Sequence, residues 1–196
     1  MKIVVMNHVT LDGVMQGPGR ADEDTRGGFE HGGWATPGSD EVVGRAYGER
    51  MARSAGLLFG RRTYEDVLGH WNSVPDSPFA SALNNSPKFV VSTTLRDPLP
   101  WPNSTLIHGD VVDAVANLKA QPGGDLGIMG SGTVIETLLH HDLIDEYLLM
   151  IHPIVLGSGR RLFPEGSPPT TLDLVGSEIA TTGVLVSTYA ARSSHS

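Results

Sequence analysis

Two adjacent arginines, Arg61 and Arg62, follow a glycine in the segment GLLFGRRTYEDV at residues 56–67. Each guanidinium group can donate two parallel hydrogen bonds to a phosphate. A helix that begins at Thr63 would add free backbone N–H groups and the positive end of its dipole. The whole chain carries a formal net charge of -8, so the pair does not belong to a generally basic protein. We therefore expect this segment to meet an anionic group.

Two other predicted strands end in small or hydroxyl-bearing residues. These residues are Ser92, Thr93 and Thr94 after the strand KFVV, and Gly130, Ser131, Gly132 and Thr133 after the strand DLGIM. The carboxyl ends of neighbouring parallel strands form the crevice in which ligands bind, and glycines there let the backbone approach an anion closely. Three such ends on one rim could hold a molecule with several phosphates, so the sequence favours a nucleotide.

Each of these segments also has a purely structural interpretation. A Gly-Ser-Gly turn is often only a tight connection between a strand and a helix, and Ile135 stands where the dinucleotide fingerprint needs its third glycine. Arg61 and Arg62 could form surface ion pairs, which contribute little to stability. The occurrence of all three segments in one chain is what favours ligand binding.

The composition narrows the functional classes. The 196 residues suffice for one domain, which we expect to cover residues 1–190, with a frayed tail at 191–196. The net charge of -8 would repel a phosphate backbone, so we expect no nucleic-acid partner. The chain has no cysteine and no HExxH spacing, so we expect no metal site.

The N-terminal segment MKIVVMNHVTLDG contains an apolar run that breaks at Asn7. This run is too short for the apolar region of a signal peptide or for a membrane span. We therefore expect a cytoplasmic protein without a membrane partner.

Short apolar runs alternate with helical patterns, which is typical of an α/β fold with a mostly parallel sheet. The predicted strands lie at residues 2–6, 56–60, 88–93, 104–108, 125–129, 143–157, 170–175 and 184–190. The predicted helices begin at Ser39, at Thr63, after Asp110 and at Thr133. We expect the last two strands to form an antiparallel hairpin at one edge. The connection at 12–38 contains eight glycines, and so long a loop inside a domain is typical of a functional segment.

Several segments resemble one known family. They are TLDG at 10–13, GGFEHGGW at 27–34, LLFGRRTYEDV at 57–67, KFVVSTTL at 88–95, GIMGSGTVIETLL at 127–139 and LIDEYLLMIHPIVLGSGRRLF at 143–163. The resemblance is to the dihydrofolate-reductase-like fold family, and within it to the group related to the C-terminal reductase domain of the riboflavin-pathway bifunctional deaminase-reductase. It implies a mixed, mostly parallel central sheet flanked by helices, NADPH across the strand ends, and a homodimer.

The resemblance also implies roles for individual residues. Gly60, Arg61, Arg62 and Thr63 would contact the pyrophosphate and the 2′-phosphate side of the cofactor, Ser92, Thr93 and Thr94 the 2′-phosphate, Gly130, Ser131, Gly132 and Thr133 the pyrophosphate, and Val14 and Gln16 the nicotinamide. Asp12 would be the catalytic acid, although an aspartate before a glycine is equally typical of a turn. Trp34, as an aromatic residue of the glycine-rich loop, is expected over the substrate.

Two departures from the family pattern concern the substrate. Met129 stands where riboflavin-type enzymes carry an acidic residue, and residues 28–34 do not contain the acid-bearing helix of dihydrofolate reductases. The main hypothesis is therefore an NADPH-dependent reductase that transfers a hydride to a small heterocyclic or carbonyl substrate. The alternatives are 5-amino-6-(5-phosphoribosylamino)uracil reductase, dihydrofolate reductase, and a non-catalytic protein that binds a nucleotide or a pterin-like ligand.

Overall fold

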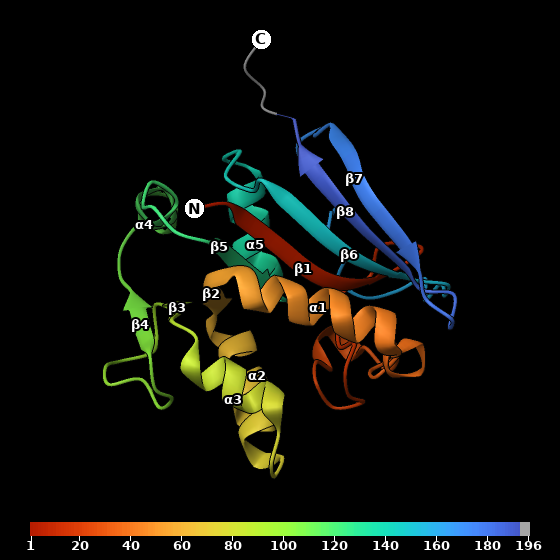
Figure 1. Ribbon diagram of the computed structural model, residues 1–196, viewed down its shortest axis with the longest axis horizontal. Helices are drawn as coiled ribbons and strands as arrows, with labels where there is room; N and C mark the ends of the chain where they lie inside the picture. Colours follow the sequence, from red (N-terminus) through yellow and green to blue (C-terminus); the bar gives the residue numbers. More distant parts are fainter. Residues whose placement is uncertain (193–196) are drawn as a thin grey trace.

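The computed structural model describes residues 1–192 and consists of an eight-stranded sheet flanked by helices (Figure 1). The strands are β1 Ile3–Thr10, β2 Ser54–Gly60, β3 Lys88–Val91, β4 Ser104–Ile107, β5 Asp125–Met129, β6 Glu146–His152, β7 Leu172–Ile179 and β8 Leu185–Ala191. The helices are α1 Glu41–Arg53, α2 Arg61–Ser73, α3 Pro78–Asn85, α4 Val111–Lys119 and α5 Gly132–Leu139, with short 3₁₀ turns at Arg26–Gly28 and Thr36–Gly38.

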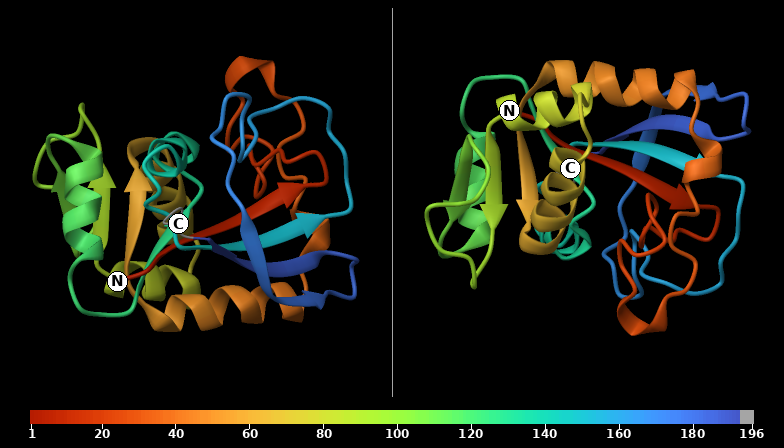
Figure 2. Two further views of the ribbon diagram at one scale, coloured as in Figure 1. Left: turned by 90° about the horizontal axis from the view of Figure 1, so that it is seen from above. Right: turned by 90° about the horizontal axis from the view of Figure 1, so that it is seen from below.

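The strand order is β4-β3-β2-β5-β1-β6-β8-β7. All neighbours from β4 to β6 run parallel, whereas β8 is antiparallel to both β6 and β7. The prediction of a mixed, mostly parallel sheet with a C-terminal edge hairpin is therefore confirmed. In the views of Figure 2 the hairpin lies at the end of the sheet opposite β4.

Helices cover both faces of the sheet, and the central strand β1 is buried on both of them (Figure 2). Ile3 and Val5 pack in one core cluster with residues of α4 and α5. Val4 and Met6 pack in a second cluster with residues of α1, α2 and α3. Side chains alternate between faces along a strand, so a continuous apolar run is what a doubly covered strand requires.

Several predicted boundaries differ from those of the structure. Strand β1 extends to Thr10 because it pairs with β6 as far as His152. Helix α1 is capped by Asp40, whose carboxylate accepts a hydrogen bond from the Val43 N–H, and not by Ser39. Helix α2 begins at Arg61 instead of Thr63.

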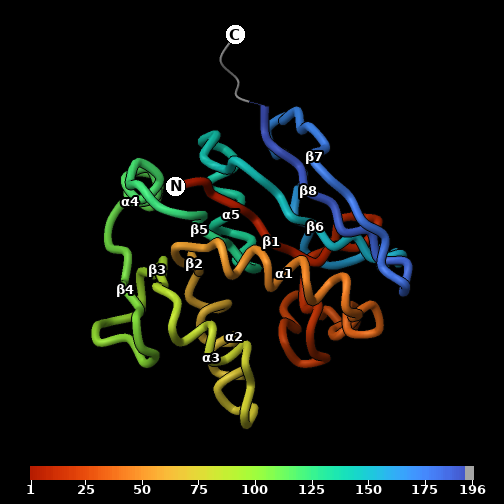
Figure 3. Tube along the Cα trace, viewed as in Figure 1, coloured from red at the N-terminus to blue at the C-terminus, as the bar shows by residue number. Residues whose placement is uncertain are grey.

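Helix α3 was not predicted from the sequence, because its eight residues PFASALNN form too short a pattern. The predicted strand 143–157 is shorter in the structure, since β6 covers only Glu146–His152. Residues 191 and 192 of the expected tail are held in the fold, because Ala191 is the last residue of β8 and the Arg192 N–H donates to the Thr171 carbonyl. Residues 193–196 of the expected tail lie outside the described residues. In the trace of Figure 3, β8 runs beside β7 at the edge of the sheet.

The glycine-rich loop, residues 12–38, folds around a small core of its own. Val14, Phe29, Trp34 and Ala35 form this third apolar cluster. Gly32 is required there, because a β-carbon at this position would lie 2.6 Å or less from the carbonyl oxygens of residues 20 and 21. The loop is therefore an ordered wall beside the sheet.

A buried ion-pair network joins α1 to the N-terminal ends of two strands. Arg50 is 8% exposed and donates to Asp125 at 3.1 Å and to the carboxylate of Glu146, which is 7% exposed. Lys2 completes the network with a 2.9 Å ion pair to Glu146. The arginine and the lysine hold the pKa of Glu146 below its usual range, although burial acts in the opposite direction.

We predict that Arg50→Met lowers the free energy of unfolding by about 3 kcal/mol or more, because it leaves a buried carboxylate with one partner fewer. Urea unfolding would measure this change. The matched control is Arg45→Met on the same helix, whose partner Glu178 is exposed. Its expected effect is below about 1 kcal/mol. Equal losses in the two variants would contradict the assigned role of burial.

Candidate functional site

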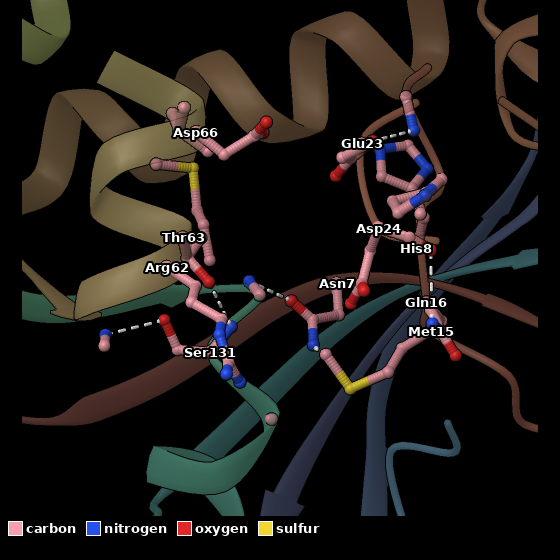
Figure 4. Close-up of a pocket in the computed structure, with 18 of the residues that line it drawn as sticks. Asn7, His8, Met15, Gln16, Glu23, Asp24, Arg62, Thr63, Asp66 and Ser131 are labelled. Atoms are coloured by element: carbon pink, nitrogen blue, oxygen red, sulfur yellow. Dashed lines mark hydrogen bonds between the residues drawn. The ribbon is translucent and has the colours of Figure 1, made fainter. Parts of the chain in front are cut away.

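A cleft of about 2210 Å³ opens at the C-terminal ends of β1, β2, β3 and β5. The glycine-rich loop lines one wall, and the first turns of α2 and α5 line the other. Figure 4 shows Gln16, Glu23 and Asp24 on the loop side and Arg62 and Thr63 on the helix side. Such a crevice at the carboxyl ends of parallel strands is where α/β sheets bind ligands.

The N-termini of α2 and α5 lie next to each other in this cleft. The Gly60 N–H donates to the Ser131 hydroxyl at 2.8 Å, and the Ser131 N–H donates to the Thr63 hydroxyl at 3.0 Å. Neither helix has a side-chain hydrogen bond capping its first turn. Two sets of backbone N–H groups and two positive dipole ends therefore face the same space, which suits an anion.

The turn between β5 and α5 depends on backbone conformations that favour glycine. Gly130 has φ 57°, and a β-carbon there would lie 3.0 Å from the Thr63 side chain. Ser131 follows in the same left-handed region at φ 58°. The Gly130 N–H is held at 2.7 Å by the amide oxygen of Asn7, which is only 3% exposed.

Asn7 was not among the predicted site residues. The signal that could have identified it is a polar residue at the end of an otherwise apolar buried strand. Its side chain faces the cleft in Figure 4 and links the middle of β1 to the turn after β5.

The structure separates the roles of the two arginines. Arg61 pairs with Glu65 one helical turn later, at 2.8 Å. Arg62 is exposed, lines the cleft, and forms no ion pair with the described part of the chain. Arg62 is therefore the guanidinium group available to a ligand, and the surface ion pair considered for both residues applies to Arg61.

The predicted cofactor residues of the other two strand ends also line this cleft. Ser92 forms a turn in which its hydroxyl accepts from the Thr94 and Leu95 N–H groups at 3.1 and 2.9 Å. Thr93 and Thr94 are exposed next to it. The fold thus brings the three segments singled out from the sequence into one cavity, together with Gly132 and Thr133.

Asp12 does not line the cleft. Its carboxylate accepts hydrogen bonds from the Thr10 hydroxyl at 2.6 Å, from the Gly157 N–H at 2.8 Å and from the Leu156 N–H at 3.2 Å. The Thr10 hydroxyl above all, and then these N–H groups, lower the pKa of Asp12 to about 2. Such a carboxylate stays ionised and has no proton to donate. The structure therefore favours the interpretation of Asp12 as an aspartate that stabilises a turn over its predicted role as the catalytic acid.

Three other residues that were expected to contact the cofactor or the substrate instead stabilise the glycine-rich loop. Trp34 is 8% exposed, and its indole N–H donates to the Gln16 carbonyl, so it lies in the loop core and not over a substrate. Val14 is fully buried and does not line the cleft. Gln16 does line it, but its side chain donates to two loop carbonyls and accepts from the Arg160 N–H.

The loop side of the cleft carries titratable groups that were not predicted. His8 Nδ1 lies 2.9 Å from Nε2 of His152, and the ring of His8 stacks on Tyr47 with centroids 5.7 Å apart. Burial, followed by the neighbouring His152, lowers the pKa of His8 to about 3. Glu23 lines the same end of the cleft. Among residues 1–192, no three potential metal ligands cluster together.

The RibD C-terminal domain family matches residues 1–186. The chain belongs to this family. The uncharacterized protein YyaP of Bacillus subtilis is 30% identical to this chain over 139 residues, which are 68% of this chain and 72% of YyaP.

Two solved structures have a similar fold. A putative riboflavin biosynthesis protein from Shewanella sp. PV-4 aligns with a TM-score of 0.75 and 29% identity, covering 98% of this chain and 100% of its own. Dihydrofolate reductase from Enterococcus faecalis, solved with NADP(H), aligns with a TM-score of 0.58 and 15% identity, covering 98% and 97%. The fold is dihydrofolate-reductase-like, and family and fold together support a reductase. In the described residues, no helix is both long and apolar enough to cross a membrane.

The half-buried His8 at the cleft predicts acid sensitivity. Its pKa of about 3 in the folded protein lies below the ordinary 6.5, so the unfolded chain binds one more proton between these values. Stability should therefore be complete above pH 6.5 and fall, by at most about 1.4 kcal/mol per pH unit, as the pH drops towards 3. His8→Asn should flatten this slope in urea titrations, whereas His108→Asn, at a 69% exposed side chain, should not. An unchanged slope in His8→Asn would contradict the assignment.

Proposed function

We propose that the protein is an NADPH-dependent reductase that transfers a hydride to a small heterocyclic or carbonyl substrate. The observation that carries this proposal is the pair of adjacent helix N-termini joined through Ser131, with the free Arg62 beside them. Uncapped N–H groups and a turn that contains a glycine in the left-handed region suit a pyrophosphate, which is the shared part of nicotinamide cofactors. The geometry therefore fits this cofactor.

The proposed placement follows from the charges along the cleft. The turns at 60–63 and 130–133 would bind the pyrophosphate through backbone N–H groups. Arg62 and the hydroxyls of Ser92, Thr93 and Thr94 would bind the 2′-phosphate, because a guanidinium group and hydroxyl donors suit a phosphate. The nicotinamide would then lie towards the end of β1. When bound, NADPH supplies two electrons and a proton together as a hydride.

The substrate is the less constrained part of the proposal. Met129 is 6% exposed and lines the cleft, so this position offers no carboxylate to the pyrimidine of 5-amino-6-(5-phosphoribosylamino)uracil. That substrate and dihydrofolate remain alternatives for a screen. A non-catalytic protein would bind NADPH but would not oxidise it, whichever substrate is added. This difference separates the binding hypothesis from the enzymatic ones.

Arg62 predicts selectivity between the two nicotinamide cofactors. Arg62→Ala should weaken NADPH binding roughly 10- to 100-fold, because one charge-assisted contact to the 2′-phosphate is lost. NADH lacks this phosphate, so its weaker binding should change little. Isothermal titration calorimetry of both cofactors would measure this, with Arg45→Ala, outside the cleft, as the control. Equal losses of affinity for NADPH and NADH in Arg62→Ala would refute the assignment of Arg62 to the 2′-phosphate. If the unchanged protein bound neither nucleotide, the proposed cofactor would be refuted.

We also propose a cytoplasmic homodimer. Edge strand β7 exposes Leu174, Val175 and Ile179 by 58%, 64% and 74%, and an apolar edge strand of this kind favours association. Sedimentation velocity should give the mass of a dimer for the unchanged protein. Val175→Lys with Ile179→Lys should yield monomers with an unaltered circular dichroism spectrum. A monomer before substitution would refute the dimer.

A further inference from the structure

We propose that Glu23 is the catalytic residue that supplies the proton to the substrate, an inference that rests on the proposed reductase function. Glu23 lies on the glycine-rich loop and lines the cleft, facing the wall formed by α2 (Figure 4). Of the other acids that line the cleft in the described chain, Asp22, Asp66 and Glu65 form ion pairs with arginines, and no hydrogen bond fixes the carboxyl groups of Glu136 and Glu165. Asp12 lies outside the cleft, and both oxygens of Asp24 bind Arg26.

The carboxyl group of Glu23 is held through one oxygen only. Oε2 accepts hydrogen bonds from the Gly19 N–H at 2.5 Å and from the Arg20 N–H at 3.1 Å. Oε1 has no hydrogen-bond partner within residues 1–192, so it remains available to a ligand in the cleft. A catalytic acid needs this combination of a fixed orientation and one unoccupied oxygen.

An ion pair across the cleft keeps this part of the loop in position. The Arg20 guanidinium group donates to the carboxylate of Asp66 on α2, and both side chains are 28% exposed. Glu23 lies three residues after Arg20 and binds its N–H group. The loop segment that carries the acid is therefore tied to the helix whose N-terminus would bind the cofactor.

The surroundings of Glu23 favour its protonated form. Burial in the cleft is the main cause of its raised pKa, and the nearby carboxylate of Asp66 adds to it, whereas the two N–H groups and Arg20 act in the opposite direction. The remaining titratable neighbour is Tyr47 of α1, which stacks on the His8 ring. Tyr47 and His8 are both neutral near pH 7, because burial raises the pKa of the first and lowers that of the second.

The inferred step takes a hydride from NADPH, which is left as NADP⁺, and a proton from Glu23. A carbon of a substrate C=N or C=O group accepts the hydride, and the π-electron pair moves to the nitrogen or oxygen. That atom takes the proton from Oε1 of Glu23, which becomes a carboxylate and regains a proton from water. The substrate class is therefore a molecule whose heteroatom is adjacent to the reduced carbon and can reach the loop wall, such as a cyclic imine or a ring carbonyl.

The first test follows Glu23 itself. Carbon-13 NMR would follow the glutamate carboxyl groups during a pH titration. The resonance that disappears in Glu23→Gln belongs to Glu23, and its titration midpoint should lie above the ordinary pKa of 4.5. A midpoint at or below 4.5 would overturn the proposal whether or not a substrate is known.

The second test measures turnover and cofactor binding together. NADPH oxidation would be followed with 5-amino-6-(5-phosphoribosylamino)uracil, dihydrofolate and benzaldehyde as probes. Glu23→Gln keeps an oxygen that can accept from Gly19 and Arg20, and should lower kcat about 100-fold or more with unchanged NADPH affinity. The fall of kcat at high pH should also disappear. The control Glu30→Gln changes an exposed glutamate of the same loop, outside the cleft, and should leave both quantities unchanged.

The outcomes separate this proposal from the one on which it rests. The role of Glu23 would be overturned if Glu23→Gln turned over as fast as the unchanged protein, or if it lost as much NADPH affinity as kcat. Either result would leave the proposed reductase function unaffected. A protein that neither binds NADPH nor oxidises it would overturn both proposals. If NADPH binds but no probe is reduced, the titration midpoint of Glu23 decides whether the proposed role of Glu23 is kept or rejected.

Discussion

The hydrogen bonds of Ser131 to Gly60 and Thr63 hold together the two helices on which the site depends. The interaction places two positive helix ends side by side, and like partial charges repel each other. An anion between them would remove this repulsion and satisfy the free N–H groups of both first turns. The same bonds bring Gly130 close to Thr63, where a β-carbon would lie 3.0 Å from the threonine side chain, and glycine also suits the φ of 57° at this position.

The opposite wall of the cleft depends on Gln16 in a comparable way. Its side chain binds two carbonyl groups of the loop and one N–H group of residue 160, and its own carbonyl accepts from the buried Trp34. A segment of this length without long helices or strands is ordered because its polar backbone groups find such partners. The loop therefore presents Glu23 to the cleft in a defined orientation, and Arg20 ties it to α2.

Three carboxyl groups show how the environment assigns different tasks to one chemical group. Asp12 and Glu146 are both held in the ionised form, the first by hydrogen-bond donors in a turn and the second by Arg50 and Lys2. Glu23 lies in a cleft with fewer compensating charges, and its protonated form is favoured. Only the last of these environments raises the pKa of its carboxyl group, so the position of an acid in the fold decides which form is favoured.

The sequence by itself determined the fold class and the three segments that form the proposed phosphate-binding wall. Local patterns suffice for this, because apolar runs, helix caps and glycine turns depend on residues close together in the chain. The sequence could not distinguish Arg61 from Arg62 or place Trp34, because an ion pair one helical turn away and burial under a loop both depend on the folded geometry. Only the tertiary structure brought Asn7 to Gly130 and Glu23 to the cleft, across separations that no local pattern records. It also moved Asp12 out of the cleft, because hydrogen bonds from residues 156 and 157 hold its carboxylate in a turn.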